Sequence, residues 1–111
     1  MSKRPAHLLI EDIWDAMTRI EQYTAGLAQA QFLTDRRTSD AVVRNLEIIG
    51  EAANRLPIDV RQQHPQIEWQ KIVGLRHRIV HDYFGIDLEM VWEILRHDLP
   101  AFKTKLQALR L

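Results

Sequence analysis

The sequence contains no cysteine, and this absence excludes disulfide bonds, thiolate metal ligands and cysteine nucleophiles. Glycine and proline are scarce, with four of each in 111 residues, so few positions interrupt regular secondary structure. No apolar run approaches the ~20 residues that a membrane span needs. The basic start of the chain contains Glu11, Asp12 and Asp15, which break any signal-peptide core. We therefore expect a cytoplasmic protein without a membrane segment.

An excess of charge of either sign is also absent, because fifteen Lys and Arg balance fifteen Asp and Glu. A zero net charge argues against one large basic surface for nucleic acid or anionic lipid, although it leaves room for a small basic site. What the chain does contain is 46% hydrophobic residues, a value typical of folded globular proteins. Its length predicts a single domain over residues 1–111.

Most of the sequence carries an apolar period of 3.6 residues, which predicts an all-α fold. Prolines, glycines and capping residues divide this pattern into segments. The expected helices are residues 5–27, a second helix that follows a turn at residues 32–37 and ends at Pro57, one or two turns at 58–64, a long helix from about 68 to Gly85, a helix after Asp87, and a last helix from Leu99 to Leu109. We interpret this pattern as an antiparallel helical bundle of four to five helices.

Specific residues are expected at the helix ends and in the core. Thr34 or Asp35 can cap the second helix, and Asp87 and Asp98 can cap later ones. Gly85 is expected to close the long helix in a left-handed conformation. The predicted core positions are Leu9, Ile13, Met17, Ile20, Tyr23 and Leu27 in the first helix, Val42, Leu46, Ile49, Ala53 and Leu56 in the second, Trp69, Ile72, Leu75 and Ile79 in the third, Leu88, Val91, Trp92 and Leu95 in the fourth, and Phe102, Leu106 and Leu109 at the end.

Residues 75–85 concentrate the groups that could carry chemistry, because four of these eleven residues are Arg or His. On a regular helix Arg76 and Tyr83 are seven residues apart and share a face, and so do His77 and His81 at a spacing of four. Arg76 and His81 would lie about 140° apart around such a helix. They could meet at one ligand where the helix distorts before its end, or in a cleft shared by two copies. We favour the second arrangement, a two-fold homodimer.

These residue types support metal-independent cleavage of RNA. A neutral His can accept the proton of a ribose 2′-hydroxyl, and a second His can return a proton to the leaving 5′-oxygen. The planar guanidinium of Arg76 can hold two phosphate oxygens, and Tyr83 can stack on an unpaired base. His77 and His81 also have the spacing of a metal-binding pair, but the sequence places no third ligand, so we expect no metal and no cofactor.

The segment Arg76-x4-His81-x-Tyr83 resembles the R-x4-H-x-Y motif of the HepT-type toxins in the HEPN superfamily. Further stretches resemble the same proteins in order and spacing. They are LEIIGEA at residues 46–52, the approach from Pro65 through WQKIVGLR at residues 69–76, and WEI with DLP at residues 92–100. The resemblance therefore extends over nearly the whole chain. One departure is His77, because family motifs often have Asn after the arginine.

The resemblance implies a helical-bundle homodimer whose paired motifs form a ribonuclease cleft for RNA. It implies that Arg76 and His81 are the catalytic pair. It also implies a partner antitoxin, an MntA-like minimal nucleotidyltransferase, which neutralises the toxin by transferring AMP to Tyr83. His77, Arg78 and Glu51 are candidates for supporting roles at the same site.

Other interpretations of the same residues stay open. Arg76 and His81 could form surface ion pairs with Asp82 or Glu51, since such pairs are commoner than active sites. Tyr83 could be a half-buried aromatic residue at a helix end. A second function of a different class is a non-catalytic nucleotide-binding or interaction partner of a nucleotidyltransferase, in which Arg76 binds a nucleotide phosphate.

Overall fold

The computed structural model describes residues 3–80 and 85–109, and the regular elements within these ranges are all helices. They are α1 (Ala6–Thr24), α2 (Gln29–Thr34), α3 (Arg36–Arg55), α4 (Ile58–Gln62), α5 (Trp69–Val73), α6 (Leu75–Ile79), α7 (Leu88–Glu93), the π-helical turn η2 (Ile94–Asp98), α8 (Leu99–Leu106) and the 3₁₀ turn η3 (Gln107–Leu109). The all-α prediction is confirmed. The expected number of four to five helices is too low, because the short helix α2 and the break at Gly74 were not foreseen, whereas the helical turns expected at residues 58–64 are present as α4.

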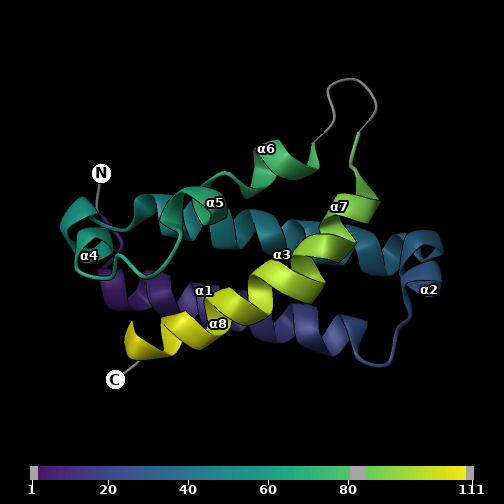
Figure 1. Ribbon diagram of the computed structural model, residues 1–111, viewed down its shortest axis with the longest axis horizontal. Helices are drawn as coiled ribbons and strands as arrows, with labels where there is room; N and C mark the ends of the chain where they lie inside the picture. Colours follow the sequence, from purple (N-terminus) through teal and green to yellow (C-terminus); the bar gives the residue numbers. More distant parts are fainter. Residues whose placement is uncertain (1–2, 81–84, 110–111) are drawn as a thin grey trace.

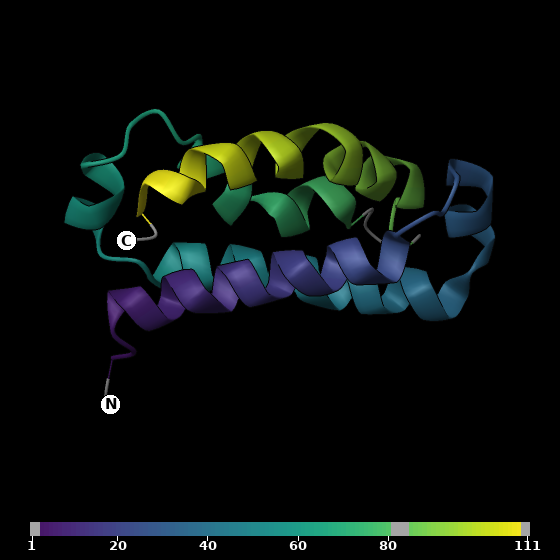
Figure 2. The ribbon, with the colours of Figure 1, turned by 90° about the horizontal axis from the view of Figure 1, so that it is seen from below.

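The helices form two layers. The long helices α1 and α3 run antiparallel and share the most extensive contact in the molecule (Figure 1). The second layer contains α5 and α6 beside the continuous α7–η2–α8 arm (Figure 2). Since α3 contacts both α5 and α6, it forms the floor beneath the segment that leads into the motif.

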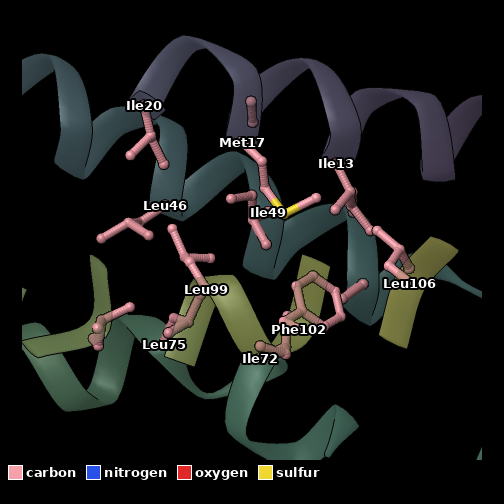
Figure 3. Packing of buried hydrophobic residues seen from close by; sticks show 14 of the residues in the cluster. Ile13, Met17, Ile20, Leu46, Ile49, Ile72, Leu75, Leu99, Phe102 and Leu106 are labelled. Carbon is pink, nitrogen blue, oxygen red and sulfur yellow. The ribbon is translucent and has the colours of Figure 1, made fainter. Parts of the chain in front are cut away.

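The core lies between these two layers (Figure 3). The predicted stripe of α3 is confirmed, because its apolar residues from Val42 to Leu56 are buried at each predicted position. In α1 the stripe is confirmed as far as Ile20, but Tyr23 is wrong as a core residue because 41% of it is exposed. The helix ends one residue later, at Thr24, and Gly26 turns the chain with a φ of 76°. Leu27 therefore lies beyond the helix.

The connection between α1 and α3 contains a short helix where a turn was expected. Phe32 in α2 is fully buried, and its ring lies 5.3 Å from the ring of Trp92 in α7. Burial of this aromatic residue explains why the segment is helical rather than an exposed turn. Asp35 follows directly, and its carboxylate accepts a hydrogen bond of 3.1 Å from the Thr38 N–H. The prediction that Asp35 caps the next helix is confirmed.

The prediction of one long helix from residue 68 to Gly85 is wrong. It is divided at Gly74, where a Cβ would lie 3.0 Å from the carbonyl oxygen of Gln70. The second piece, α6, ends at Ile79, because Val80 has an extended conformation and forms an antiparallel bridge with Ile86. The N–H of Asp87 also donates to the Ile79 carbonyl at 2.7 Å. Among the described residues, backbone pairing of Ile79 and Val80 with Ile86 and Asp87 therefore takes the place of a helical continuation at Val80.

The C-terminal arm is more continuous than expected. Asp98 has helical φ and ψ angles and no capping hydrogen bond, so the predicted helix start there is wrong. The chain instead passes from α7 through the π turn into α8, and the Leu99 N–H donates to the Ile94 carbonyl. Pro100 lacks an N–H, and a π turn before it lets the helix continue without that hydrogen bond.

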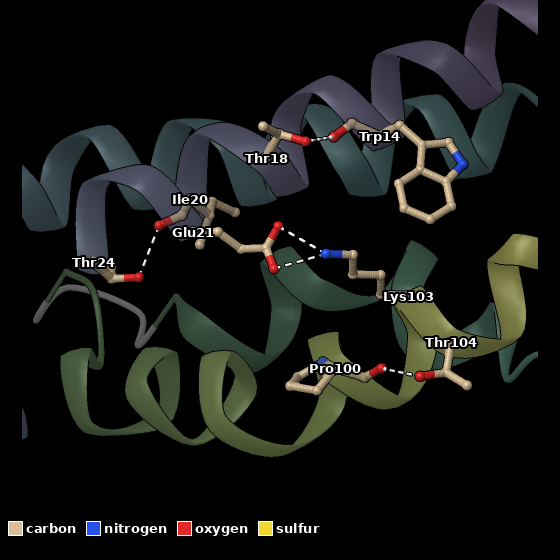
Figure 4. A network of polar contacts seen from close by, with 8 residues as sticks. All are labelled: Trp14, Thr18, Ile20, Glu21, Thr24, Pro100, Lys103 and Thr104. Carbon is tan, nitrogen blue, oxygen red and sulfur yellow. Dashed lines mark hydrogen bonds and ion pairs between the residues drawn. The ribbon is translucent and has the colours of Figure 1, made fainter. Parts of the chain in front are cut away.

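Two side-chain contacts position this arm. Asp87 caps α7 as predicted, accepting a 3.0 Å hydrogen bond from the Met90 N–H. Lys103 in α8 lies 2.9 Å and 3.0 Å from the two carboxylate oxygens of Glu21 in α1 (Figure 4). The second contact joins the two layers at their surface.

Candidate functional site

A hollow lies between α3 and the α5–α6 segment, and it contains the first two polar residues of the motif. Its volume is about 460 Å³. Arg76 and His77 in α6 line it, and both side chains belong to exposed residues. We call this feature the α3–α6 hollow. It is of the size in which proteins bind small ligands or single nucleotides.

The floor of the hollow is the face of α3 that carries Glu47 and Glu51. These two residues are four apart and therefore share a face of the helix. Gly50 lies between them, and a Cβ there would be 3.3 Å from the carbonyl oxygen of Ile72. The glycine therefore permits the close approach of α3 and α5 that gives the hollow its shape.

Arg76 is free of a nearby counter-charge within the described ranges. No carboxylate there lies within 4.0 Å of its guanidinium group, whereas Glu51 pairs with Arg55 at 3.0 Å. The structure therefore contradicts an ion pair between Arg76 and Glu51. Among the described residues no carboxylate pairs with this exposed guanidinium, and such a group can bind an anion such as a phosphate.

Arg78 lies on the opposite side of α6 and has different contacts. Its guanidinium group forms an ion pair with Asp98 in the π turn and lies 3.9 Å from the sulfur of Met90. About 31% of the Arg78 side chain and 23% of the Asp98 side chain are exposed. Arg78 therefore joins α6 to the C-terminal arm rather than contributing to the hollow.

The rest of the motif lies outside the described residues. His81, Asp82 and Tyr83 belong to this part of the chain, so the predictions for them are not tested. The chain enters this segment from Val80 and leaves it near Ile86, and these two residues are paired. The helix-face grouping of His77 with His81, and of Arg76 with Tyr83, assumed a regular helix beyond Ile79, where α6 ends, so it stays a prediction.

The sequence analysis missed residues at the far end of the hollow. Arg61 in α4 lines it together with Asn54 and Gln70, and the Arg61 Nε is buried without a hydrogen-bond partner in the described structure. No spacing along the chain links Arg61 to the motif, because the loop between α4 and α5 separates them. The sequence feature that could have indicated this hollow is the row of polar residues at every third or fourth position of α3.

Two further findings concern metal binding and membrane insertion. In the part of the chain that the structure describes, no three His, Asp or Glu side chains come together in a way that could hold a metal ion. Within the same ranges, no helix is long and apolar enough to cross a membrane.

Comparison with known proteins defines the class. A family model described as ribonuclease HepT-like matches residues 13–109, and the chain belongs to this family. It is similar to a protein named "Probable ribonuclease HepT" from Thermococcus cleftensis, with 39% identity over 97% of this chain and 98% of that protein. It is also similar to a "Putative RNase" from Methanocaldococcus jannaschii, with 34% identity over 96% of this chain and 88% of that protein. A search of solved structures found no match.

Proposed function

We propose that the protein is the toxin of a toxin–antitoxin system and acts as a metal-independent endoribonuclease on tRNA or mRNA. The observation that carries this proposal is the exposed Arg76 at the rim of the α3–α6 hollow, without a carboxylate partner in the described structure, in a chain of the HepT-like ribonuclease family. The guanidinium group would bind the scissile phosphate and stabilise the charge that develops on it.

In the proposed reaction, His81 of one subunit accepts the proton of the ribose 2′-hydroxyl, and the 2′-oxygen attacks the phosphorus. The bond from phosphorus to the 5′-oxygen then breaks. His81 of the partner subunit donates a proton to this oxygen, and the products are a 2′,3′-cyclic phosphate and a 5′-hydroxyl. This scheme needs two copies of the chain, because each copy contributes one motif histidine.

Cleavage of labelled tRNA and mRNA in the presence of EDTA tests this proposal. Arg76→Ala and His81→Ala are each expected to lower the rate by a factor of about 10²–10⁴, because each removes one group that acts on the reacting atoms. Arg19→Ala and His7→Ala are matched controls, since both residues are exposed on α1. Equal activity of His81→Ala and wild type would contradict the assignment, and absence of cleavage by wild type would contradict the function.

Neutralisation by AMP transfer is the second part of the proposal. The Tyr83 hydroxyl would attack the α-phosphate of ATP, bound by an MntA-like nucleotidyltransferase partner, and release pyrophosphate. Tyr83 is only seven residues from Arg76 in the sequence, so the phosphate added to it would compete with RNA for the guanidinium group of Arg76.

Co-expression with such a partner is expected to add one or more AMP units to the wild-type chain, measured by intact mass, and to abolish RNA cleavage. Tyr23→Phe is the matched control for Tyr83→Phe, because Tyr23 is the other tyrosine of the chain and is exposed. AMP addition to Tyr83→Phe at the wild-type level would contradict the choice of tyrosine.

A further inference from the structure

The α3–α6 hollow carries charges of both signs in a definite order. The carbonyl oxygens of Ile72 and Val73 lie opposite Gly50, and α3 runs antiparallel to the α5–α6 segment (Figure 1). Glu47, one turn before Gly50, therefore lies toward the Arg76 end. Arg61, from the helix that follows α3, lies toward the other end. The hollow thus has an arginine at each end and carboxylates between them.

This order matches one nucleotide of a single-stranded RNA. Each base in such a strand is flanked by two phosphates, which an arginine at each end can bind. A phosphate would be repelled by the carboxylates in the middle, whereas the N–H groups of a base are attracted to them. The middle of the hollow is therefore suited to a base and not to the RNA backbone.

The two carboxylates differ in their availability. Glu51 is engaged by Arg55 at 3.0 Å, while no cationic group in the described ranges lies within 4.0 Å of Glu47. A carboxylate accepts hydrogen bonds through both oxygens. Guanine has two N–H donors side by side on its Watson–Crick edge, N1–H and the N2 amino group, and it can form both bonds with one carboxylate. Adenine and cytosine offer only one such donor, and the single N–H of uracil is flanked by two carbonyl oxygens that a carboxylate repels.

We infer that the α3–α6 hollow is a base-recognition site in which Glu47 selects guanine in the nucleotide whose phosphate is bound by Arg76. This inference rests on the proposed ribonuclease function and names the substrate of the same site. Asn54 lies on the same face of α3, and its amide can donate to the O6 acceptor of the base.

Binding of the four nucleoside 3′-monophosphates to the full chain, measured by titration calorimetry, tests the inference without requiring cleavage. Wild type is expected to bind 3′-GMP at least about tenfold more tightly than 3′-AMP, 3′-CMP and 3′-UMP. Glu47→Gln is expected to abolish this preference, because the amide replaces one acceptor by a donor. Glu11→Gln makes the same charge change on α1, outside the hollow, and should retain it. Arg76→Ala should weaken all four nucleotides by a similar factor, since the phosphate is common to them.

Equal binding of the four nucleotides, no binding of any of them, or an unchanged preference in Glu47→Gln would overturn the inference. Cleavage of RNA oligomers that differ only in one central base separates it from the proposed function. A protein that prefers 3′-GMP but cleaves no RNA would contradict the ribonuclease proposal alone. A protein that cleaves RNA but binds all four nucleotides equally would contradict only the guanine site.

Discussion

Arg76 and Arg78 show how two identical residues in one short helix acquire different roles. Two residues correspond to about 200° around an α-helix, so their side chains leave α6 on opposite sides. One lines the α3–α6 hollow, and the other is paired with Asp98. The sequence predicted this cationic cluster but could not divide it, because the partner of Arg78 lies twenty residues further along the chain.

This division predicts opposite effects of two alanine substitutions. Arg78→Ala should lower the free energy of unfolding by about 1–2 kcal/mol, because it leaves the partly buried Asp98 without its partner. Arg76→Ala should change the free energy of unfolding by less than about 0.5 kcal/mol, because Arg76 is exposed and has no ion-pair partner in the described structure. Urea unfolding of the two variants beside wild type gives both values. A stability loss in Arg76→Ala equal to that in Arg78→Ala would refute the division.

At the scale of elements, the helix caps were predictable and the helix breaks were not. Asp35 and Asp87 cap their helices through local hydrogen bonds, which depend on residues three positions away. The end of α6 depends instead on pairing between Val80 and Ile86, and the π turn depends on Pro100 within a packed arm. Apolar periodicity continues through such breaks, because both pieces of the helix still face the same core.

The cap of α3 predicts a pH dependence of stability. Hydrogen bonds from the Thr38 hydroxyl and backbone N–H hold the pKa of Asp35 below its ordinary value. The pKa of Asp35 is thus lower in the folded than in the unfolded protein. The ionised cap therefore stabilises the fold fully above the unfolded pKa, and this stabilisation is lost as pH falls through the folded pKa. Asp35→Asn should therefore reduce the loss of melting temperature between neutral and acidic pH.

Thermal unfolding at pH 7 and at about pH 3 measures this difference. Asp40→Asn is the matched control, because it removes an exposed carboxylate from the same helix without removing the cap. A pH dependence of Asp35→Asn identical to that of wild type would show that the cap does not contribute.

At the scale of the whole molecule, the sequence predicted an all-helical protein and most of its core, because burial follows directly from the helical period. It did not predict the hollow, which requires α3, α4 and the α5–α6 segment to be placed in space. Gly50 is an example of a residue whose role could not be predicted from the sequence. Its role is visible only in three dimensions, where a Cβ at this position would lie 3.3 Å from the carbonyl oxygen of Ile72.

The proposed reaction requires a homodimer with the motifs in contact. Val80 and Ile86 lie on either side of the segment that carries His81 and Tyr83, and each is 38% exposed, so a second copy could cover them. Val80→Glu should weaken self-association, measured by sedimentation velocity, and should lower RNA cleavage in parallel. Ile58→Glu is the control, because Ile58 is 64% exposed on α4, away from the motif. A monomeric wild type at micromolar concentration would contradict the shared cleft.

The ion pair between Arg78 and Asp98 has a consequence for protein synthesis. During translation, Asp98 leaves the ribosome twenty residues after Arg78, so a nascent chain displays Arg76 before the helix that carries it has gained its anchor. The ion pair that joins α6 to the C-terminal arm can therefore form only after residue 98 has been synthesised.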